Sequence, residues 1–123
     1  MSDEGRDYVL FLEDIVEAIG KIEIYSGDLS LDEFRANAMA VDAVIRNFEI
    51  IGEAAKNIPV KVKEKYPNVE WKEAAGFRDV LIHAYFGIDV EAVWDTIKNN
   101  VPMFKLHVSH ALQSEKQERV QPV

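Results

Sequence analysis

The chain has 123 residues, a formal net charge of −8 and no cysteine. The length suits a single domain, residues 1–123, and a hydrophobic content of 48% is enough for a packed core, which argues against disorder. The lack of cysteine excludes disulfides, a thiol nucleophile and cysteine-ligated zinc, and it fits a reducing cytoplasm, the expected location. No apolar run approaches the length of a membrane span, and an acidic chain is a poor general binder of nucleic acid.

The first expected helix runs from about Asp7 to Ile24 and ends at the break Ser26-Gly27-Asp28. The apolar residues in it recur every three or four positions, which is the pattern of a helix with one buried face. This apolar seam consists of Tyr8, Leu12, Ile15, Ile19 and Ile22.

The second expected helix opens at Ser30, where Glu33 completes a capping box, and continues without interruption to Pro59. Its apolar seam consists of Phe34, Ala38, Val41, Ile45, Phe48, Gly52 and Ala55, a period that favours helices packed at shallow angles. Gly52 within this seam would let another backbone come close, at a helix-propensity cost of about 1 kcal/mol.

Residues 60–67 form a short basic piece of one or two expected helical turns, and a solvated face is favoured over a phosphate track for its lysines, Lys61, Lys63 and Lys65. A third long helix is expected to begin near Glu70 or Trp71 and to end at Gly87. Trp71 and Trp94 are expected to be core or interface anchors.

The fourth expected helix is capped by Asp89 and continues the three-four spacing through Val90, Trp94, Ile97, Val101, Phe104, Val108 and Ala111. Pro102 falls inside this pattern, so we expect a kink near Asn99-Asn100 without a break. Residues 113–123 lack periodicity and are expected to fray, which leaves a core of about residues 7–112. Strand signals are nearly absent, so the sequence predicts an all-α, antiparallel four-helix bundle with a short extra helix.

The stretch 77–87 carries the strongest candidate for chemistry, because Arg78, His83 and Tyr85 fall within eight residues. On a helix Arg78 and Tyr85 lie on nearly the same line, and Asp79 neighbours His83. Arg78 suits phosphate oxygens, and the imidazole of His83 can take a proton from a ribose 2′-hydroxyl or give one to a leaving oxygen. Asp79 could fix the tautomer of His83. The spacing alone also fits surface charges beside a histidine that fills a gap, and both interpretations stay open here.

RNA cleavage through the 2′-hydroxyl needs no metal, because the nucleophile belongs to the substrate. His107 and His110 are three positions apart and could supply two metal ligands, but no third ligand is implied and a solvated face is favoured. The charged residues of the second helix, Arg46, Glu49 and Glu53, are expected to form ion pairs and not a catalytic pair. No metal site is therefore predicted.

Three segments, residues 43–56, 71–89 and 93–94, together resemble the HepT branch of the HEPN superfamily. The likeness covers the chain from about Asp7 to Leu112. The R-x-x-x-x-H-x-Y core is weak by itself and fairly specific in this context and order. Many relatives have Asn directly after the arginine, where this chain has Asp79.

The resemblance implies a homodimer of HEPN-like four-helix bundles whose two motifs face each other across a cleft, and a toxin similar to metal-independent endoribonucleases. It implies Arg78 and His83 as the catalytic pair, supported by Asp79, and no cofactor. It also implies a cognate MntA-like nucleotidyltransferase antitoxin that adenylylates the motif tyrosine, Tyr85 here. The alternative is a non-catalytic HEPN module that binds a nucleotide or a partner and regulates a nucleotidyltransferase, which the net charge favours.

Overall fold

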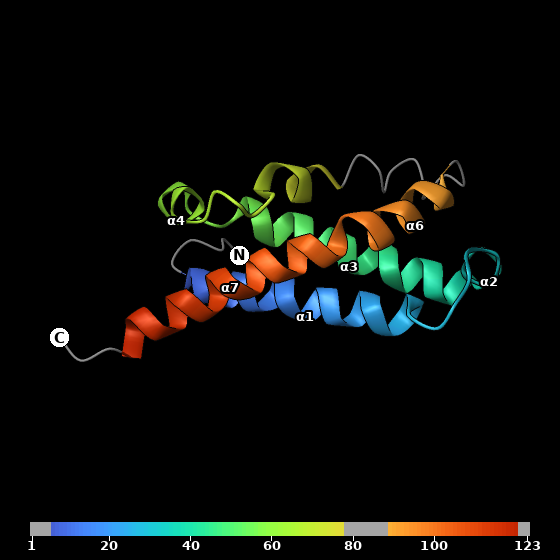
Figure 1. Ribbon diagram of the computed structural model, residues 1–123, viewed down its shortest axis with the longest axis horizontal. Coiled ribbons are helices and arrows are strands. Elements are labelled where there is room, and N and C mark those ends of the chain that lie inside the picture. The colour runs from blue at the N-terminus through green and yellow to red at the C-terminus, as the bar shows by residue number, and fades with distance from the viewer. Residues whose placement is uncertain (1–5, 78–88, 121–123) are drawn as a thin grey trace.

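The structure is a computed structural model that describes residues 6–77 and 89–120, and every regular element in these ranges is a helix (Figure 1). The helices are α1 (Tyr8–Ser26), α2 (Leu31–Ala36), α3 (Ala38–Lys56), α4 (Val60–Lys65), α6 (Val90–Asn99) and α7 (Val101–Val120), with residues 71–77 also helical. α1 runs antiparallel to α3, and α7 packs along α1 in the opposite direction (Figure 1). The predicted all-α bundle is confirmed for the described residues. None of their helices is both long enough and apolar enough to cross a membrane.

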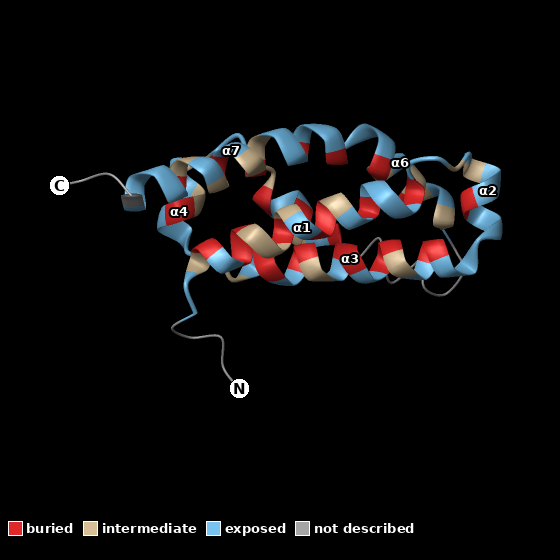
Figure 2. Ribbon diagram, turned by 90° about the horizontal axis from the view of Figure 1, so that it is seen from below, coloured by how far each residue is buried: buried red, intermediate tan, exposed pale blue. Residues whose placement is uncertain are grey.

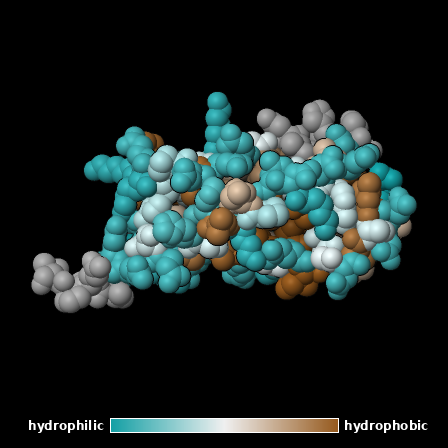
Figure 3. Space-filling model, viewed as in Figure 1, coloured by the Kyte–Doolittle hydropathy of each residue, from teal (hydrophilic) through white to brown (hydrophobic). Residues whose placement is uncertain are grey.

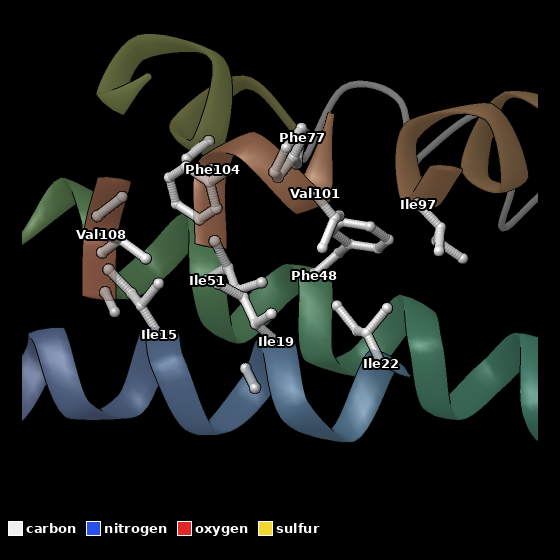
Figure 4. Packing of buried hydrophobic residues seen from close by; sticks show 14 of the residues in the cluster. Ile15, Ile19, Ile22, Phe48, Ile51, Phe77, Ile97, Val101, Phe104 and Val108 are labelled. Carbon is white, nitrogen blue, oxygen red and sulfur yellow. The ribbon is translucent and has the colours of Figure 1, made fainter. Parts of the chain in front are cut away.

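The core lies between α1, α3 and α7, and the buried residues of each helix face the other two (Figure 2). The seam predicted for the first helix is confirmed, since Leu12, Ile15, Ile19 and Ile22 are fully buried. Figure 4 shows these isoleucines meeting α3 and α7 side chains, namely Phe48, Ile51, Val101, Phe104 and Val108. Burial of side chains of this size contributes about 1.5–3 kcal/mol each, so this seam dominates the stability of the fold.

Three predicted helix starts are confirmed by their side-chain caps. The carboxylate of Asp7 accepts a hydrogen bond from the Val9 N–H at 3.0 Å, and Asp89 Oδ1 accepts one from the Ala92 N–H at 2.9 Å. Ser30 and Glu33 form the complete capping box, with N–O distances of 3.1 and 2.9 Å. Each cap satisfies backbone donors that have no partner within the helix.

The uninterrupted helix expected from Ser30 to Pro59 is wrong, because Asn37 divides it into α2 and α3. Asn37 has φ −104° and ψ 90°, and its side chain accepts a hydrogen bond from the Ala40 N–H at 3.0 Å. This local bond competes with the helical conformation, which is why asparagine favours caps over helix interiors. As a result Phe34 belongs to the separate short helix α2, where it is buried. Ala38, which was placed on the predicted seam, begins α3 and is exposed.

The expected kink near Asn99-Asn100 without a break is wrong, because the helix is interrupted there. α6 ends at Asn99, Asn100 is not helical, and α7 begins at Val101. Pro102 lies in the first turn of α7, where its missing N–H leaves no intrahelical bond unmade. The seam still passes across the interruption, because Ile97, Val101 and Phe104 are all buried.

The frayed tail expected from residue 113 is wrong for residues 113–120, which continue α7 as helix. Glu115 in this stretch is 1% exposed. A buried carboxylate requires partners, and these partners tie the segment to the rest of the bundle.

Candidate functional site

The predicted site residues Arg78, Asp79, His83 and Tyr85 belong to residues 78–88 and lie outside the described residues. The structure does describe both flanks of this segment, residues 71–77 before it and Asp89 after it. These flanks are the described residues that adjoin the segment in the chain.

The flank before the segment is fixed at its start by Tyr66 and Trp71. The Trp71 indole N–H donates a hydrogen bond to the Tyr66 carbonyl at 3.1 Å, and the Val69 N–H donates to the same oxygen, also at 3.1 Å. Trp71 itself is buried. The two bonds close the turn that leads from α4 into the helical residues 71–77, and they confirm Trp71 as a core anchor.

The rest of this flank packs against α3 and α7. A Cβ atom built on Gly52 would lie 3.4 Å from the Ala74 carbonyl oxygen, so the close backbone approach predicted at Gly52 is confirmed. Phe77 stacks edge-on between Phe48 and Phe104, with ring centroids 5.0 and 6.4 Å away (Figure 4). The residue just before Arg78 in the chain is therefore held by two aromatic contacts in the core.

The flank after the segment begins with the Asp89 cap of α6, followed by Val93, which is buried. Trp94 packs on Phe34 with ring centroids 5.2 Å apart, and the Lys98 ammonium lies 4.5 Å from the Trp94 ring centre. Trp94 is thus the expected anchor between α6 and α2, and one face of its ring is occupied by a cation.

A polar cluster around the buried Glu115, which we call the Glu115 cluster (Glu115, Tyr8, Lys65 and Tyr66), lies where α7, α1 and the end of α4 meet. The Glu115 carboxylate accepts hydrogen bonds from the Tyr66 hydroxyl at 2.5 Å, from Lys65 Nζ at 2.6 Å and from the Tyr8 hydroxyl. Lys65 Nζ also contacts Glu118 at 2.8 Å. This cluster was not predicted from the sequence, although Glu115 extends the seam of Val108 and Ala111 by one further step of four.

The protonation of the Glu115 cluster follows from these bonds. Burial alone raises the pKa of the Glu115 carboxyl, but the hydrogen bonds from Lys65, Tyr66 and Tyr8 hold that pKa below its ordinary value. Burial and then the bond to Glu115 raise the pKa of Tyr66 to about 12. The bonds to Glu115 and Glu118 raise the pKa of Lys65. At neutral pH the cluster therefore holds an ionised Glu115 carboxylate beside a protonated Lys65 and a protonated Tyr66.

The remaining candidates from the sequence are surface or structural groups. Lys65 is committed to the Glu115 cluster, so the run of three lysines is not a uniform phosphate track. Arg46 and Glu49 form the expected ion pair at 3.6 Å. His110 is exposed, while His107 is half-buried with Nδ1 lacking a hydrogen-bond partner. No group of three or more possible metal ligands occurs within residues 6–77 and 89–120.

The surface seen in the view of Figure 1 is mostly hydrophilic, with separate hydrophobic patches (Figure 3). Among the large apolar side chains of residues 6–77 and 89–119, Met39 and Ile24 have the highest exposed fractions, 84% and 77%. These two residues belong to the ends of different helices, α3 and α1. The class of protein defined so far is a small, acidic helical bundle in which two packed flanks, residues 71–77 and the start of α6, adjoin the predicted motif in the chain.

Comparison with known proteins adds the family. The family model described as Ribonuclease HepT-like matches residues 15–111. The "Probable ribonuclease HepT" of Thermococcus cleftensis is 46% identical over 100 residues, which cover 81% of this chain and 91% of that relative. The "Putative RNase MJ1380" of Methanocaldococcus jannaschii is 46% identical over 103 residues, 84% of this chain and 94% of that relative.

The same archaeon has a longer relative, "Gamma-glutamylcyclotransferase and putative RNase MJ0434", which is 44% identical over 100 residues, 81% of this chain. The match spans only 45% of that relative's length. No solved structure matched the chain. The chain belongs to the HepT-like ribonuclease family, and the resemblance seen in the sequence is confirmed.

Proposed function

We propose that this protein is a metal-independent endoribonuclease that acts as the toxin of a type VII-like toxin–antitoxin pair. The observation that carries the proposal is the Arg78-x-x-x-x-His83-x-Tyr85 motif inside a HepT-like ribonuclease match over residues 15–111. Relatives that share 46% identity over most of their length are named as ribonucleases, which supports RNA as the substrate.

In the proposed reaction His83 accepts the proton of a ribose 2′-hydroxyl, and the 2′-oxygen attacks the adjacent phosphorus. The bond from phosphorus to the 5′-oxygen breaks, the leaving oxygen takes a proton, and a cyclic phosphate remains on the upstream fragment. Arg78 binds the non-bridging oxygens, where negative charge grows in the transition state. Asp79 supports His83 by fixing the position of its second ring nitrogen.

The net charge of −8 opposes RNA binding, so the proposal includes a homodimer. Two Arg78 side chains brought together across a two-fold axis would create a local positive cleft in an acidic protein. Sedimentation of the purified protein tests this part. A monomer at the concentrations where RNA is cleaved would contradict it.

The direct test replaces His83 with Ala and measures growth arrest and RNA cleavage. We expect a loss of at least about 100-fold in cleavage, the scale of a general acid–base group. His107→Ala is the matched control, because His107 is a histidine outside the motif whose Nδ1 has no hydrogen-bond partner, and it should keep activity close to that of the wild type. Unchanged cleavage by a folded His83→Ala protein would falsify the proposal.

The proposed antitoxin is an MntA-like nucleotidyltransferase that attaches AMP to Tyr85. The added phosphate would repel RNA and occupy the motif next to Arg78. Co-expression of the two proteins followed by mass spectrometry should show AMP on the peptide that contains Tyr85. A toxin neutralised by its partner with this peptide unmodified would remove adenylylation from the proposal.

The second candidate is a non-catalytic HEPN module that binds a nucleotide or the nucleotidyltransferase and regulates it. The net charge of −8 favours this function, because binding a protein or one nucleotide needs no positive surface. Tight binding to the nucleotidyltransferase without RNA turnover, under conditions in which a relative cleaves RNA, would decide for it.

A further inference from the structure

The Glu115 cluster connects the C-terminal half of α7 to two other parts of the chain. Tyr8 belongs to the first turn of α1, and Lys65 and Tyr66 mark the end of α4. All three donate to one carboxylate whose residue is 1% exposed. Such a carboxylate has few alternative positions, because only its hydrogen-bond donors offset the free-energy cost of removing its charge from water.

Tyr66 has a second role that Tyr8 lacks. Its hydroxyl donates to Glu115 at 2.5 Å, while its carbonyl accepts the Trp71 indole N–H and the Val69 N–H. Tyr66 thus connects Glu115 to Trp71, through one hydrogen bond at its hydroxyl and another at its backbone carbonyl oxygen. This connection runs from α7 to the first residue of the helical stretch 71–77.

We propose that Glu115 and Tyr66 are positioning residues for the motif: together they fix the start of the helix whose last described residue, Phe77, directly precedes Arg78. The inference rests on the proposed function and extends it to residues outside the motif. Neither residue touches the reacting atoms. Both act through the helix they hold.

The physical basis is the stiffness of a helix compared with the precision of catalysis. A helix transmits a displacement of its first residue to its later residues, because its backbone hydrogen bonds keep the turns together. A misplacement of about 1 Å in a catalytic group can cost about 100-fold in rate. The apolar contacts of Phe77 and Ala74 limit tilting of this helix, while the directional bonds at Tyr66 set where it begins.

The test compares Tyr66→Phe with Tyr8→Phe in the full-length protein. Each variant removes one tyrosine hydroxyl from the same carboxylate and keeps the ring, including the contact of Lys65 with the Tyr66 ring and of Arg119 with the Tyr8 ring. Loss of overall stability should therefore be similar in the two variants. Only Tyr66→Phe removes the hydrogen bond that connects Glu115, through Tyr66, to Trp71.

We expect Tyr66→Phe to lower kcat for RNA cleavage about tenfold with little change in KM, and Tyr8→Phe to change kcat less than about twofold. Hydrogen exchange should be faster at the amides of Val69, Trp71 and Ala74 in Tyr66→Phe alone. Glu115→Gln should resemble Tyr66→Phe, because an amide cannot accept all three donors.

Equal losses of activity and equal exchange in Tyr66→Phe and Tyr8→Phe would overturn the proposal and leave the cluster a purely stabilising one. Wild-type activity in Tyr66→Phe would also overturn it. A wild-type protein that cleaves no RNA would overturn the proposed function and, with it, the catalytic part of this inference. In that event the exchange rates would still support or overturn the placement of residues 69–77 by Tyr66.

Discussion

The middle of the bundle and its α4 end are held by different kinds of interaction. In the middle, α1, α3 and α7 meet through side chains such as Ile19, Val44 and Val108, all fully buried and without polar atoms. At the α4 end, α1, α7 and the end of α4 meet at the Glu115 cluster, where one carboxylate takes three hydrogen bonds. Both regions contain fully buried side chains, but only the second depends on bond direction and on protonation.

This difference between the two regions shows that one part of a small domain can supply most of its stability while another part fixes the position of a helix. Apolar burial is roughly proportional to area and tolerates small shifts of one helix against another. A hydrogen bond weakens steeply with distance and angle, so a buried network fixes a position more than it adds net stability. The region nearest to the start of the helical residues 71–77 is the one built from directional bonds.

The largest effect is expected from the apolar middle. Ile19→Ala should lower the free energy of unfolding by about 3–4 kcal/mol, because it leaves a cavity in a fully packed site. Urea denaturation measures this change. Ile24→Ala is the matched control on the same helix, since Ile24 is 77% exposed, and it should change stability by less than about 0.5 kcal/mol. Equal effects of the two variants would contradict the assigned core.

Glu115→Ala should be the next most destabilising change, by about 2–3 kcal/mol at neutral pH, because it leaves two tyrosine hydroxyls without their acceptor. Glu118→Ala is the control, as Glu118 shares the contact to Lys65 but is exposed, and an exposed ion pair contributes about 0–1 kcal/mol. If Glu115→Ala and Glu118→Ala lowered the free energy of unfolding equally, the Glu115 cluster would contribute no more than an exposed ion pair.

The pH dependence of stability separates the two regions. The folded pKa of Glu115 lies below its ordinary value of 4.5, so its contribution to stability is present above pH 4.5 and is lost as the pH falls through the folded pKa. Tyr66 titrates at about 12 in the fold against 10.0 ordinarily, so its contribution is lost as the pH rises from 10 towards 12.

Urea denaturation across this pH range should therefore show an acid limb that weakens in Glu115→Gln and an alkaline limb that weakens in Tyr66→Phe. Ile19→Ala should lower stability by the same amount at every pH and keep both limbs. An alkaline limb that persists unchanged in Tyr66→Phe would show that other groups, such as Lys65, account for it.

The smallest effect is expected at the junction of α2 and α3. Asn37→Ala removes the side-chain bond to the Ala40 N–H and should cost about 1 kcal/mol, the usual value of an N-cap. Thermal unfolding followed by circular dichroism measures it. Asn68→Ala, at an exposed turn position, is the control and should leave the melting temperature unchanged. A higher melting temperature in Asn37→Ala would mean that the interruption itself is unfavourable.

Periodicity and capping determined most of what is confirmed here. The seams of the first and last helices follow from residues such as Ile15, Ile22 and Phe104, and the starts at Ser30 and Asp89 follow from their cap chemistry. These features are local, because each depends on neighbours within about one turn. The family resemblance was likewise carried by the order of residues along the chain.

Only the tertiary structure decided where the second predicted helix is divided and which polar side chains are brought together. The sequence contains Asn37 inside an apparently continuous helical pattern, and the structure shows its side chain capping α3 and dividing the helix. It contains Glu115 in a stretch that lacks obvious periodicity, and the structure shows this carboxylate buried beneath Tyr8 and Tyr66, which lie 107 and 49 positions away in the chain. Partners so distant in sequence leave no local signal, because a carboxylate on a helix is compatible with solvent until folding brings its donors to it.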